Sequence, residues 1–247
     1  MRGIQAILAL LICITSFNLS AQDAATILSK MDETIFAIKD RSVSMQMVMT
    51  NLKSGKEKVK EAVLYQKDMD KKLFRYTAPE SDAGISTLAL PNSEIYVYLP
   101  MFKKPKKITN LAESGIFTSS DFSIDDMASQ TYSEKYTPEI LSSEGDVHVL
   151  NLTPKDEKPT WTRVEVHVDK RFFYPARIDY FNKKNELEKQ AIYQYTEVSG
   201  YWTTKEVSME DMKKKHKTTL IMSDIKVNEG LDDDLFTLEN LVPEEKR

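Results

Sequence analysis

Apolar and polar residues alternate along most of this chain, which is the pattern of a strand with one buried and one solvated face. The segment 160–170 is the clearest case, because Val164, Val166 and Val168 lie on one side and charged residues or His167 lie on the other. Similar short runs continue to the end of the chain, separated by residues typical of turns. The pattern predicts about eleven strands, mostly antiparallel and joined by short turns.

A helical pattern precedes the first strand. Between Ala24 and Lys39 the apolar residues recur every three or four positions, which predicts a helix with one apolar face. Asp23 is a plausible N-cap, and the pattern stops at Asp40-Arg41. The apolar face must be buried, and the concave side of a curled sheet is the natural place for it.

The predicted fold is mainly β, of the α+β class. Consecutive strands joined by short turns form a meander, and a meander usually curls into a barrel because open edges promote aggregation. Ser123, followed by Asp125 and Asp126, has the residue types of a helix start, so one or more short helices are expected at 123–129. The segment 132–141 fits a strand or a helix and is interpreted as extended.

The first 21 residues have the features of a secretory signal peptide. Met1-Arg2 is positively charged, residues 4–14 are apolar except for one glutamine, and Leu19-Ser20-Ala21 ends the segment with small residues. We therefore expect cleavage after Ala21, a periplasmic location, and one domain over residues 22–247. A retained N-terminal anchor is the alternative, although the apolar run is shorter than the roughly 20 residues of a membrane span.

Composition excludes several classes of function for the mature chain. Cys13 is the only cysteine and lies inside the expected signal peptide, so neither a disulfide nor a thiol nucleophile is expected after cleavage. The formal net charge of −4 argues against a nucleic-acid partner, which usually requires a basic surface. We expect no cofactor, and a monomer. The three histidines are scattered without the spacing of metal ligands, and a hydrolase therefore ranks last among the functional interpretations.

Methionine recurs at alternate positions of the first expected strand, Ser42 to Met49. Together with Val43, residues Met45, Met47 and Met49 form one apolar face. Such a row is most often ordinary core, here packed against the N-terminal helix. The alternative is a lipid-binding wall, since flexible thioether side chains adapt to irregular ligands.

Four lysines follow the strand that ends at Leu99-Pro100. They are Lys103, Lys104, Lys106 and Lys107, preceded by Phe102. A solvated loop is one interpretation. The other is contact with a membrane or partner, because lysines attract anionic headgroups while an adjacent aromatic ring enters the interface.

Four segments, in this order, resemble the outer-membrane lipoprotein-sorting proteins of the LolA/LolB-like superfamily, and within it the periplasmic branch. They are Tyr96–Pro100 with the lysines after it, Ser119–Met127, Tyr174–Phe181, and Gly200–Met209 followed by 216–218 and 228–236. The resemblance implies a half-open antiparallel β-barrel of about eleven strands, with an N-terminal helix and short lid helices covering the concave face. It also implies an apolar cavity that holds acyl chains. One departure is that the expected first strand, 42–49, lacks the arginine that would hold the lid in the carrier proteins.

These observations predict a periplasmic carrier that holds lipid acyl chains or a lipidated protein and helps to move them to the outer membrane. The alternative is a non-carrier module that docks on a lipid-exporting membrane transporter. The candidate cavity residues are Val43, Met45, Met47, Met49, Ile95, Val97, Leu99, Phe122, Met127, Val164 and Val166. The candidate membrane or partner contacts are Phe102, Lys103, Lys104, Lys106 and Lys107.

Overall fold

The structure is a computed structural model that describes residues 16–92, 94–108, 120–122, 130–157 and 159–244. Its main element is one sheet of thirteen strands, in the order β6-β5-β4-β3-β2-β1-β13-β12-β11-β10-β9-β8-β7. The strands are β1 Asp40–Asn51, β2 Glu57–Lys67, β3 Lys71–Ala78, β4 Ser86–Leu90, β5 Glu94–Tyr98, β6 Lys106–Lys107, β7 Tyr136–Ser142, β8 Val147–Pro154, β9 Arg163–Asp169, β10 Pro175–Phe181, β11 Leu187–Val198, β12 Tyr201–Asp211 and β13 His216–Val227. The helices are α1 Ser16–Ile35, η1 Pro100–Phe102, α2 Tyr132–Lys135, η4 Asp233–Phe236 and α3 Leu238–Leu241.

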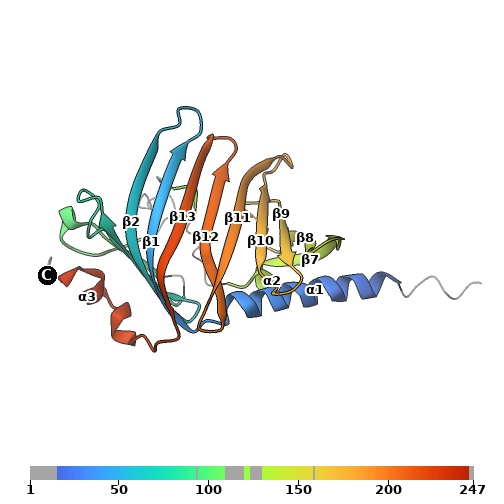
Figure 1. Cartoon of the computed structure of the whole chain (residues 1–247), viewed down its shortest axis with the longest axis horizontal. Coiled ribbons are helices and arrows are strands. Elements are labelled where there is room, and N and C mark those ends of the chain that lie inside the picture. Colours follow the sequence, from blue (N-terminus) through green and yellow to red (C-terminus); the bar gives the residue numbers. More distant parts are fainter. Residues whose placement is uncertain (1–15, 93, 109–119, 123–129, 158, 245–247) are drawn as a thin grey trace, which may run out of the picture.

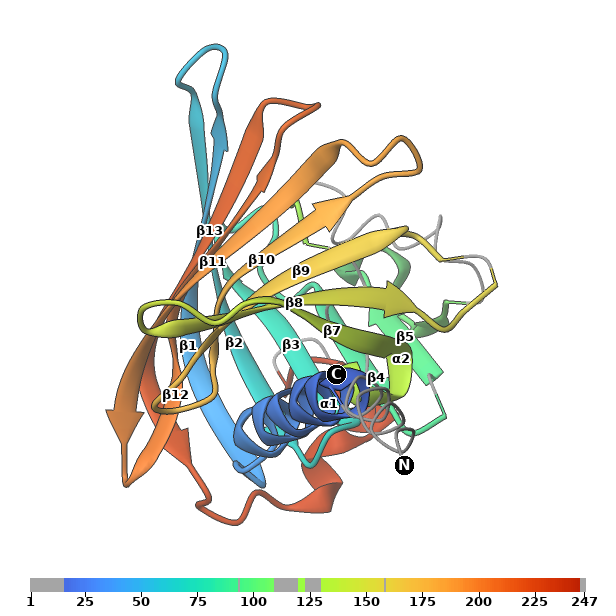
Figure 2. The ribbon, with the colours of Figure 1, turned by 90° about the vertical axis from the view of Figure 1, so that its right-hand side faces the viewer.

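Neighbouring strands pair antiparallel throughout the sheet. Two meanders, β1 to β6 and β7 to β13, are joined where β1 pairs with β13 (Figure 1). Strands β6 and β7 are therefore the two edges of the sheet. The sheet curls around α1, which lies in its open side (Figure 2). The predicted half-open antiparallel barrel is therefore confirmed.

The strand number differs slightly from the prediction. Strand β6 has only two residues, Lys106 and Lys107, which is too short to give an alternating pattern. The ambiguous segment 132–141 divides into a short helix, α2, and the edge strand β7. Both elements were therefore present in a segment that the pattern alone could not resolve.

The concave face of the sheet is the one on which α1 packs. Ala24, Leu28 and Met31 of α1 are fully buried against Val164 and Val166 of β9 and their neighbours on β8 and β10. Their spacing of three or four residues places them on one side of the helix. Burying this face against the sheet is what holds α1 in the open side.

The end of α1 differs from the prediction. The helix ends at Ile35, and Asp40 and Arg41, where the helical pattern stopped, are the first residues of β1. Asp40 is buried, and its carboxylate accepts hydrogen bonds from the backbone N–H groups of Glu229 and Gly230, at 2.9 and 3.1 Å. These contacts join the start of β1 to the chain after β13. Arg41 therefore lies in the first strand, and the expectation that this strand lacks an arginine was wrong.

The convex face of β3 to β5 is covered by the C-terminal segment. Phe236 of η4 and Leu241 of α3 are buried against Leu73, Leu88 and Tyr98. The side chains of β5 thus divide between the two faces, with Tyr98 on the convex side and Val97 on the concave side. Asp232 caps η4, because its side chain accepts a hydrogen bond from the backbone N–H of Asp234 at 3.0 Å.

Several expected features concern residues outside the described ranges. Residues 1–15 of the expected signal peptide, the short helix at 123–129 and Met127 belong to this group. The signal peptide and its cleavage after Ala21 stay a prediction. Among the helices that the structure does describe, none is long and apolar enough to cross a membrane.

Candidate functional site

A cavity of about 690 Å³ lies at one end of the concave face, beside the C-terminal end of α1. Its walls come from segments that are far apart in the sequence, including β1, β3, α2, β7 and β10 to β12. The lining residues are Ile35, Phe36, Ile38, Arg41, Gln66, Lys72, Gln130, Tyr132, Glu134, Lys135, Tyr136, Pro154, Lys155, Asp156, Pro159, Thr160, Trp161, Tyr174, Pro175, Tyr180, Tyr193, Tyr195, Trp202, Thr203 and Thr204. This volume is within the range of small-molecule sites in proteins.

Asp32 of α1 fixes one wall of the cavity. Its buried carboxylate accepts hydrogen bonds from the backbone N–H groups of Tyr132 and Ser133, at 2.8 and 2.9 Å. These are the first two residues of α2, whose N–H groups have no acceptor within the helix. Thr131 and Glu134 add a capping box. A helix of only four residues is thereby held against α1, and Tyr132 is placed in the cavity wall.

Aromatic rings form another part of the cavity wall. Tyr174 and Tyr195 stack with their ring centroids 4.3 Å apart. Their hydroxyl groups donate to backbone oxygens, Tyr174 to Trp202 and Tyr195 to Pro175. Burial raises the pKa of Tyr174 to about 12 and raises that of Tyr195 further. Both phenols are neutral and hydrogen-bonded to backbone at physiological pH, so these side chains contribute a rigid and largely apolar surface to the cavity.

Basic side chains gather at the end of the cavity where β1, β3 and α2 approach each other. Arg41 and Lys72 line the cavity there, together with Lys135. The guanidinium Nε of Arg41 donates to Gln66 at 3.1 Å. Burial, followed by the positive charges of Arg41 and Lys135, lowers the pKa of Lys72 to about 8. Sequence analysis missed this group because Asp40-Arg41 was interpreted as the end of the helix.

The methionine row lies elsewhere on the same concave face. Cross-strand pairing of Met49 with Thr218, and of Thr218 with Met209, places the row on the face that α1 also contacts. Met45, Met47 and Met49 are buried in a separate cluster with Phe74 and Tyr76 of β3 and their neighbours. Val43 is also buried.

The other candidate wall residues are distributed over both ends of the sheet. Val164 and Val166 are fully buried beneath α1, and Phe122 packs against the same cluster. Val97 is buried in β5, whereas Ile95 and Leu99 are partly exposed. None of the candidate residues that the structure describes lines the 690 Å³ cavity, so their role in lipid binding stays a prediction.

Asp121 belongs to the segment Ser120–Phe122, which crosses to the sheet. Its buried carboxylate accepts a hydrogen bond from the hydroxyl of Thr218 at 2.7 Å and lies 2.7 Å from Nδ1 of His216. Lys189 of β11 donates to the backbone oxygen of the same residue. The aspartate of this hydroxyl-rich segment thus fixes the chain to β13, a role that sequence analysis did not assign to it.

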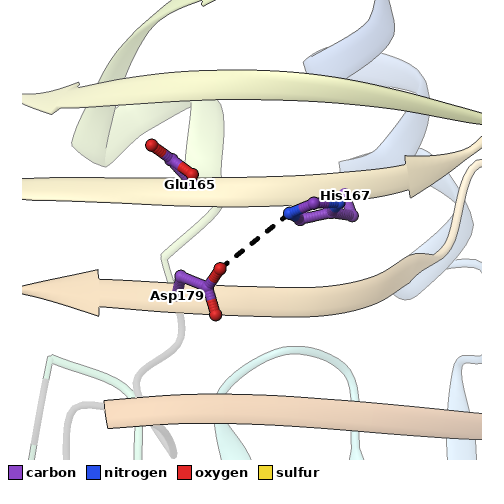
Figure 3. Close-up of side chains that lie close together, drawn as sticks. All are labelled: Glu165, His167 and Asp179. Atoms are coloured by element: carbon purple, nitrogen blue, oxygen red, sulfur yellow. Dashed lines mark ion pairs between the residues drawn. The ribbon is translucent and has the colours of Figure 1, made fainter. Parts of the chain in front are cut away.

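Glu165, His167 and Asp179 form a cluster on the convex side of β9 and β10 (Figure 3). Their ligand atoms lie within 4.8 Å of one another, as metal ligands would. However, the buried carboxylate of Asp179 already receives two contacts from Arg177, at 2.6 and 2.9 Å, and Gln190 donates to it at 2.9 Å. Burial, and next the charge of Arg177, lower the pKa of His167. The cluster is therefore best explained as an ion-pair network that stabilises the sheet.

The lysine cluster, Lys103, Lys104, Lys106 and Lys107, lies at the edge formed by β5 and β6 and is exposed. Lys107 pairs with Glu94, and the ammonium group of Lys106 lies 4.3 Å from the ring centroid of Phe102. Met101 and Phe102 are exposed large apolar residues, 79% and 47% accessible. The structure thus brings the expected basic and apolar contact residues together on one exposed turn.

Comparison with protein families gave one match by sequence. A family model described as "Uncharacterized protein" matches residues 68–242, which is more than two thirds of the chain. The chain belongs to this family. A search of curated proteins found no match.

Several solved structures share the architecture of this chain. An outer membrane lipoprotein-sorting protein domain from Vibrio parahaemolyticus matches with a TM-score of 0.80 and 24% identity, over 92% of this chain and 100% of that chain. A DUF1329 family protein from Desulfovibrio piger matches with a TM-score of 0.80 and 21% identity, over 90% and 99% of the two chains.

A LolA superfamily protein from Nitrosomonas europaea matches with a TM-score of 0.69 and 24% identity, over 87% and 97% of the two chains. At these identities the likeness shows the fold. The fold expected from the resemblance to the lipoprotein-sorting proteins of the LolA/LolB-like superfamily is thereby confirmed.

Proposed function

We propose that the protein is a periplasmic carrier that holds the acyl chains of a lipid or of a lipidated protein and helps to move them towards the outer membrane. The observation that carries this proposal is the 690 Å³ cavity between α1, α2 and the concave face. Its aromatic rings provide apolar surface, and each buried methylene of a ligand contributes about 0.8 kcal/mol to binding. No cofactor is required for this activity.

The methionine row offers a second part of the proposed binding surface. The row starts at Met45 on β1, and Arg41 of the same strand lines the cavity. Methionine side chains reorient easily around irregular ligands. An acyl chain that enters the cavity would therefore extend along β1 when these side chains move apart, and the row would be core in the empty protein and wall in the loaded one.

Release of the ligand requires a second state with lower affinity. Separation of α2 from α1 would open the cavity. Asp32 links the two helices, because its carboxylate accepts hydrogen bonds from the first two residues of α2. We infer that a membrane or a transporter favours this open state. The export signal expected at residues 1–21 supports the periplasmic location.

A non-carrier module that docks on a membrane transporter is the second candidate. It is favoured by Met101 and Phe102, which are exposed beside the lysine cluster at a sheet edge. Exposed apolar residues in a basic surrounding are typical of contacts with membranes or membrane proteins. A docking surface and a lipid cavity are also compatible with each other in one carrier.

Lipid analysis distinguishes the two candidates. The mature protein is purified from a bacterial periplasm, extracted with organic solvent and analysed by mass spectrometry, and its uptake of a fluorescent fatty acid is measured. A carrier is expected to retain lipid and to take up the probe. An empty extract together with no uptake would refute the carrier proposal and leave the docking module.

A cavity-filling variant tests whether uptake uses this site. Thr204 lines the cavity, so Thr204→Trp is expected to reduce uptake at least tenfold by occupying part of its volume. Thr219 does not line the cavity and pairs with Ser208 on the other face of the sheet. Thr219→Trp is therefore the matched control, and equal uptake by the two variants would place the ligand elsewhere.

A further inference from the structure

Positive charge is concentrated at one end of the cavity. Arg41 pairs in register with Gln66 on β2, and Gln66 pairs in register with Lys72 on β3. Cross-strand partners project from the same face of a sheet, so these three side chains lie side by side on the concave face. Lys135 approaches them from the end of α2.

Partial burial of Arg41 and Lys72 makes this arrangement costly. Desolvation lowers the pKa of both Arg41 and Lys72, and the two cations oppose each other. In the part of the chain that the structure describes, no salt bridge involves Arg41, and its side chain has one hydrogen-bond partner, Gln66. A neutral residue in place of Arg41 would be less costly, which indicates that its positive charge has a use.

The cavity lining that the structure describes holds four basic side chains and two carboxylates. They are Arg41, Lys72, Lys135 and Lys155, with Glu134 and Asp156. Glu134 is engaged in the capping box, where it accepts hydrogen bonds from the backbone N–H and the hydroxyl of Thr131, at 2.9 and 3.0 Å. The lining therefore combines an aromatic wall with a basic end, and this combination matches an amphiphile with an anionic headgroup.

We propose that Arg41 and Lys72 form a headgroup subsite that binds the phosphate or carboxylate of an acidic lipid, while the rest of the cavity receives its acyl chain. The inference rests on the proposed carrier function and names its substrate class. An arginine can donate two parallel hydrogen bonds to such an anion. Lysine supplies a mobile point charge from about 10 Å away across two strands, and both side chains are long enough to meet on one anion.

Paired ligands test the subsite in the full mature protein. Displacement of a fluorescent fatty-acid probe is measured with oleate, which is anionic, and with methyl oleate, which has the same chain without the charge. We expect oleate to bind at least tenfold more tightly than methyl oleate. Equal affinities would overturn the subsite while leaving the carrier intact, whereas no binding of either ligand would overturn the carrier itself.

Variants assign the preference to the two residues. Arg41→Gln and Lys72→Met are each expected to weaken oleate binding at least fivefold and to leave methyl oleate unchanged. Lys58, which pairs with Met49 at the far end of β2 and is exposed, provides the control Lys58→Met. The charge-conserving variants Arg41→Lys and Lys72→Arg should retain most of the preference for oleate. If the double variant Arg41→Gln/Lys72→Met still prefers oleate to methyl oleate, the assignment of the headgroup subsite to these two residues is wrong.

The source of the anion is tested with phosphate compounds. Phosphatidic acid is expected to displace the probe at micromolar concentration, and inorganic phosphate should fail to do so at a thousandfold higher concentration. Phosphatidic acid and oleate displacing the probe equally would show that the subsite accepts both phosphate and carboxylate. Inorganic phosphate that binds as tightly as phosphatidic acid would overturn the lipid assignment in favour of a free-anion site.

Discussion

Asp121 and Thr218 are joined by two hydrogen bonds although they are 97 positions apart in the sequence. The backbone N–H of Asp121 donates to the hydroxyl of Thr218 at 3.0 Å, and that hydroxyl donates to the carboxylate at 2.7 Å. His216 contacts the same carboxylate from the next position on this face of β13. The segment Ser120–Phe122 is therefore fixed to the sheet by one buried aspartate.

Replacing this aspartate should destabilise the fold. Asp121→Ala leaves the hydroxyl of Thr218 and the ring of His216 without their buried acceptor, and we expect a loss of about 2–3 kcal/mol in the free energy of unfolding. Urea denaturation measures the loss. Asp146→Ala, at an exposed position, is the control and should change stability by less than about 0.5 kcal/mol. Similar effects of the two variants would show that the contact is energetically unimportant.

The link between α1 and α2 gives a second prediction. Asp32→Ala removes the acceptor of two helix N-terminal N–H groups, those of Tyr132 and Ser133, and should cost about 1–2 kcal/mol. Hydrogen exchange at these two amides should accelerate, because α2 would separate from α1 more often. Asp32→Asn retains one carbonyl acceptor and should give an intermediate effect. Unchanged exchange in Asp32→Ala would refute the role of this residue as the link.

The lowered pKa of Lys72 should make the stability of the protein depend on pH in an unusual way. Its pKa is about 8 in the folded protein, against about 10.4 in an unfolded chain. Between these values the unfolded state binds more protons, so the free energy of unfolding rises with pH through this window. Below about pH 8 the folded state carries the full cost of a partly desolvated ammonium group.

Lys72→Met removes this cost. The variant should be more stable than the wild type by about 1–2 kcal/mol at pH 7, after allowance for solvent access to the side chain. The difference should shrink as pH rises from 8 to 10.5. Urea denaturation at four pH values measures it, and Lys58→Met is the control. Wild-type and Lys72→Met stabilities that remain parallel over this range would show that Lys72 is not desolvated.

The sequence predicted the parts of this fold that depend on periodicity. Val164, Val166 and Val168 alternate with polar residues, and all three are buried in β9 as expected. The predicted end of the helix was misplaced because aspartate is common where a helical pattern stops. In the structure the carboxylate of Asp40 instead accepts hydrogen bonds from the backbone N–H groups of Glu229 and Gly230. That contact is set by the pairing of β1 with β13, which no local pattern contains.

The cavity was beyond sequence analysis for the same reason. Alternation shows which residues share a face but not which strands become neighbours, and Arg41 and Lys72 meet only through the register of three strands. Likewise, Tyr132 of α2 and Tyr195 of β11 line the same cavity although they come from distant segments of the sequence. The buried methionines, in contrast, were found from their spacing alone.

The lysine cluster should mediate binding to anionic membranes. The triple variant Lys103→Glu/Lys104→Glu/Lys106→Glu replaces three exposed cations beside Phe102, and we expect at least a tenfold loss of binding to phosphatidylglycerol vesicles in a sedimentation assay. Lys107 is left in place because it pairs with Glu94. Binding should also weaken with added salt, since the contact is electrostatic.

The control for this variant reverses an equal charge elsewhere. Three exposed lysines at the β1–β2 hairpin, Lys53, Lys56 and Lys58, allow the same change of charge on strands that β3 and β4 separate from β5. Their triple reversal should reduce vesicle binding by less than threefold. If the two triple variants lose binding equally, net charge and not the β5–β6 turn is responsible.

The methionine row can be tested as core or as binding wall with one substitution and two ligands. Met47 is buried between Met45 and Met49, and Met47→Trp adds volume where a long acyl chain would extend from the cavity. Overpacking should cost about 1–3 kcal/mol of stability whichever interpretation holds. Binding is the decisive measurement. If the row is a binding wall, the affinity of the variant for oleate should fall at least tenfold. Its affinity for decanoate should stay unchanged, because the shorter chain ends before it reaches Met47. A variant that binds both ligands as the wild type does would show that the row is core alone, and one that loses both equally would point to a general defect of the cavity.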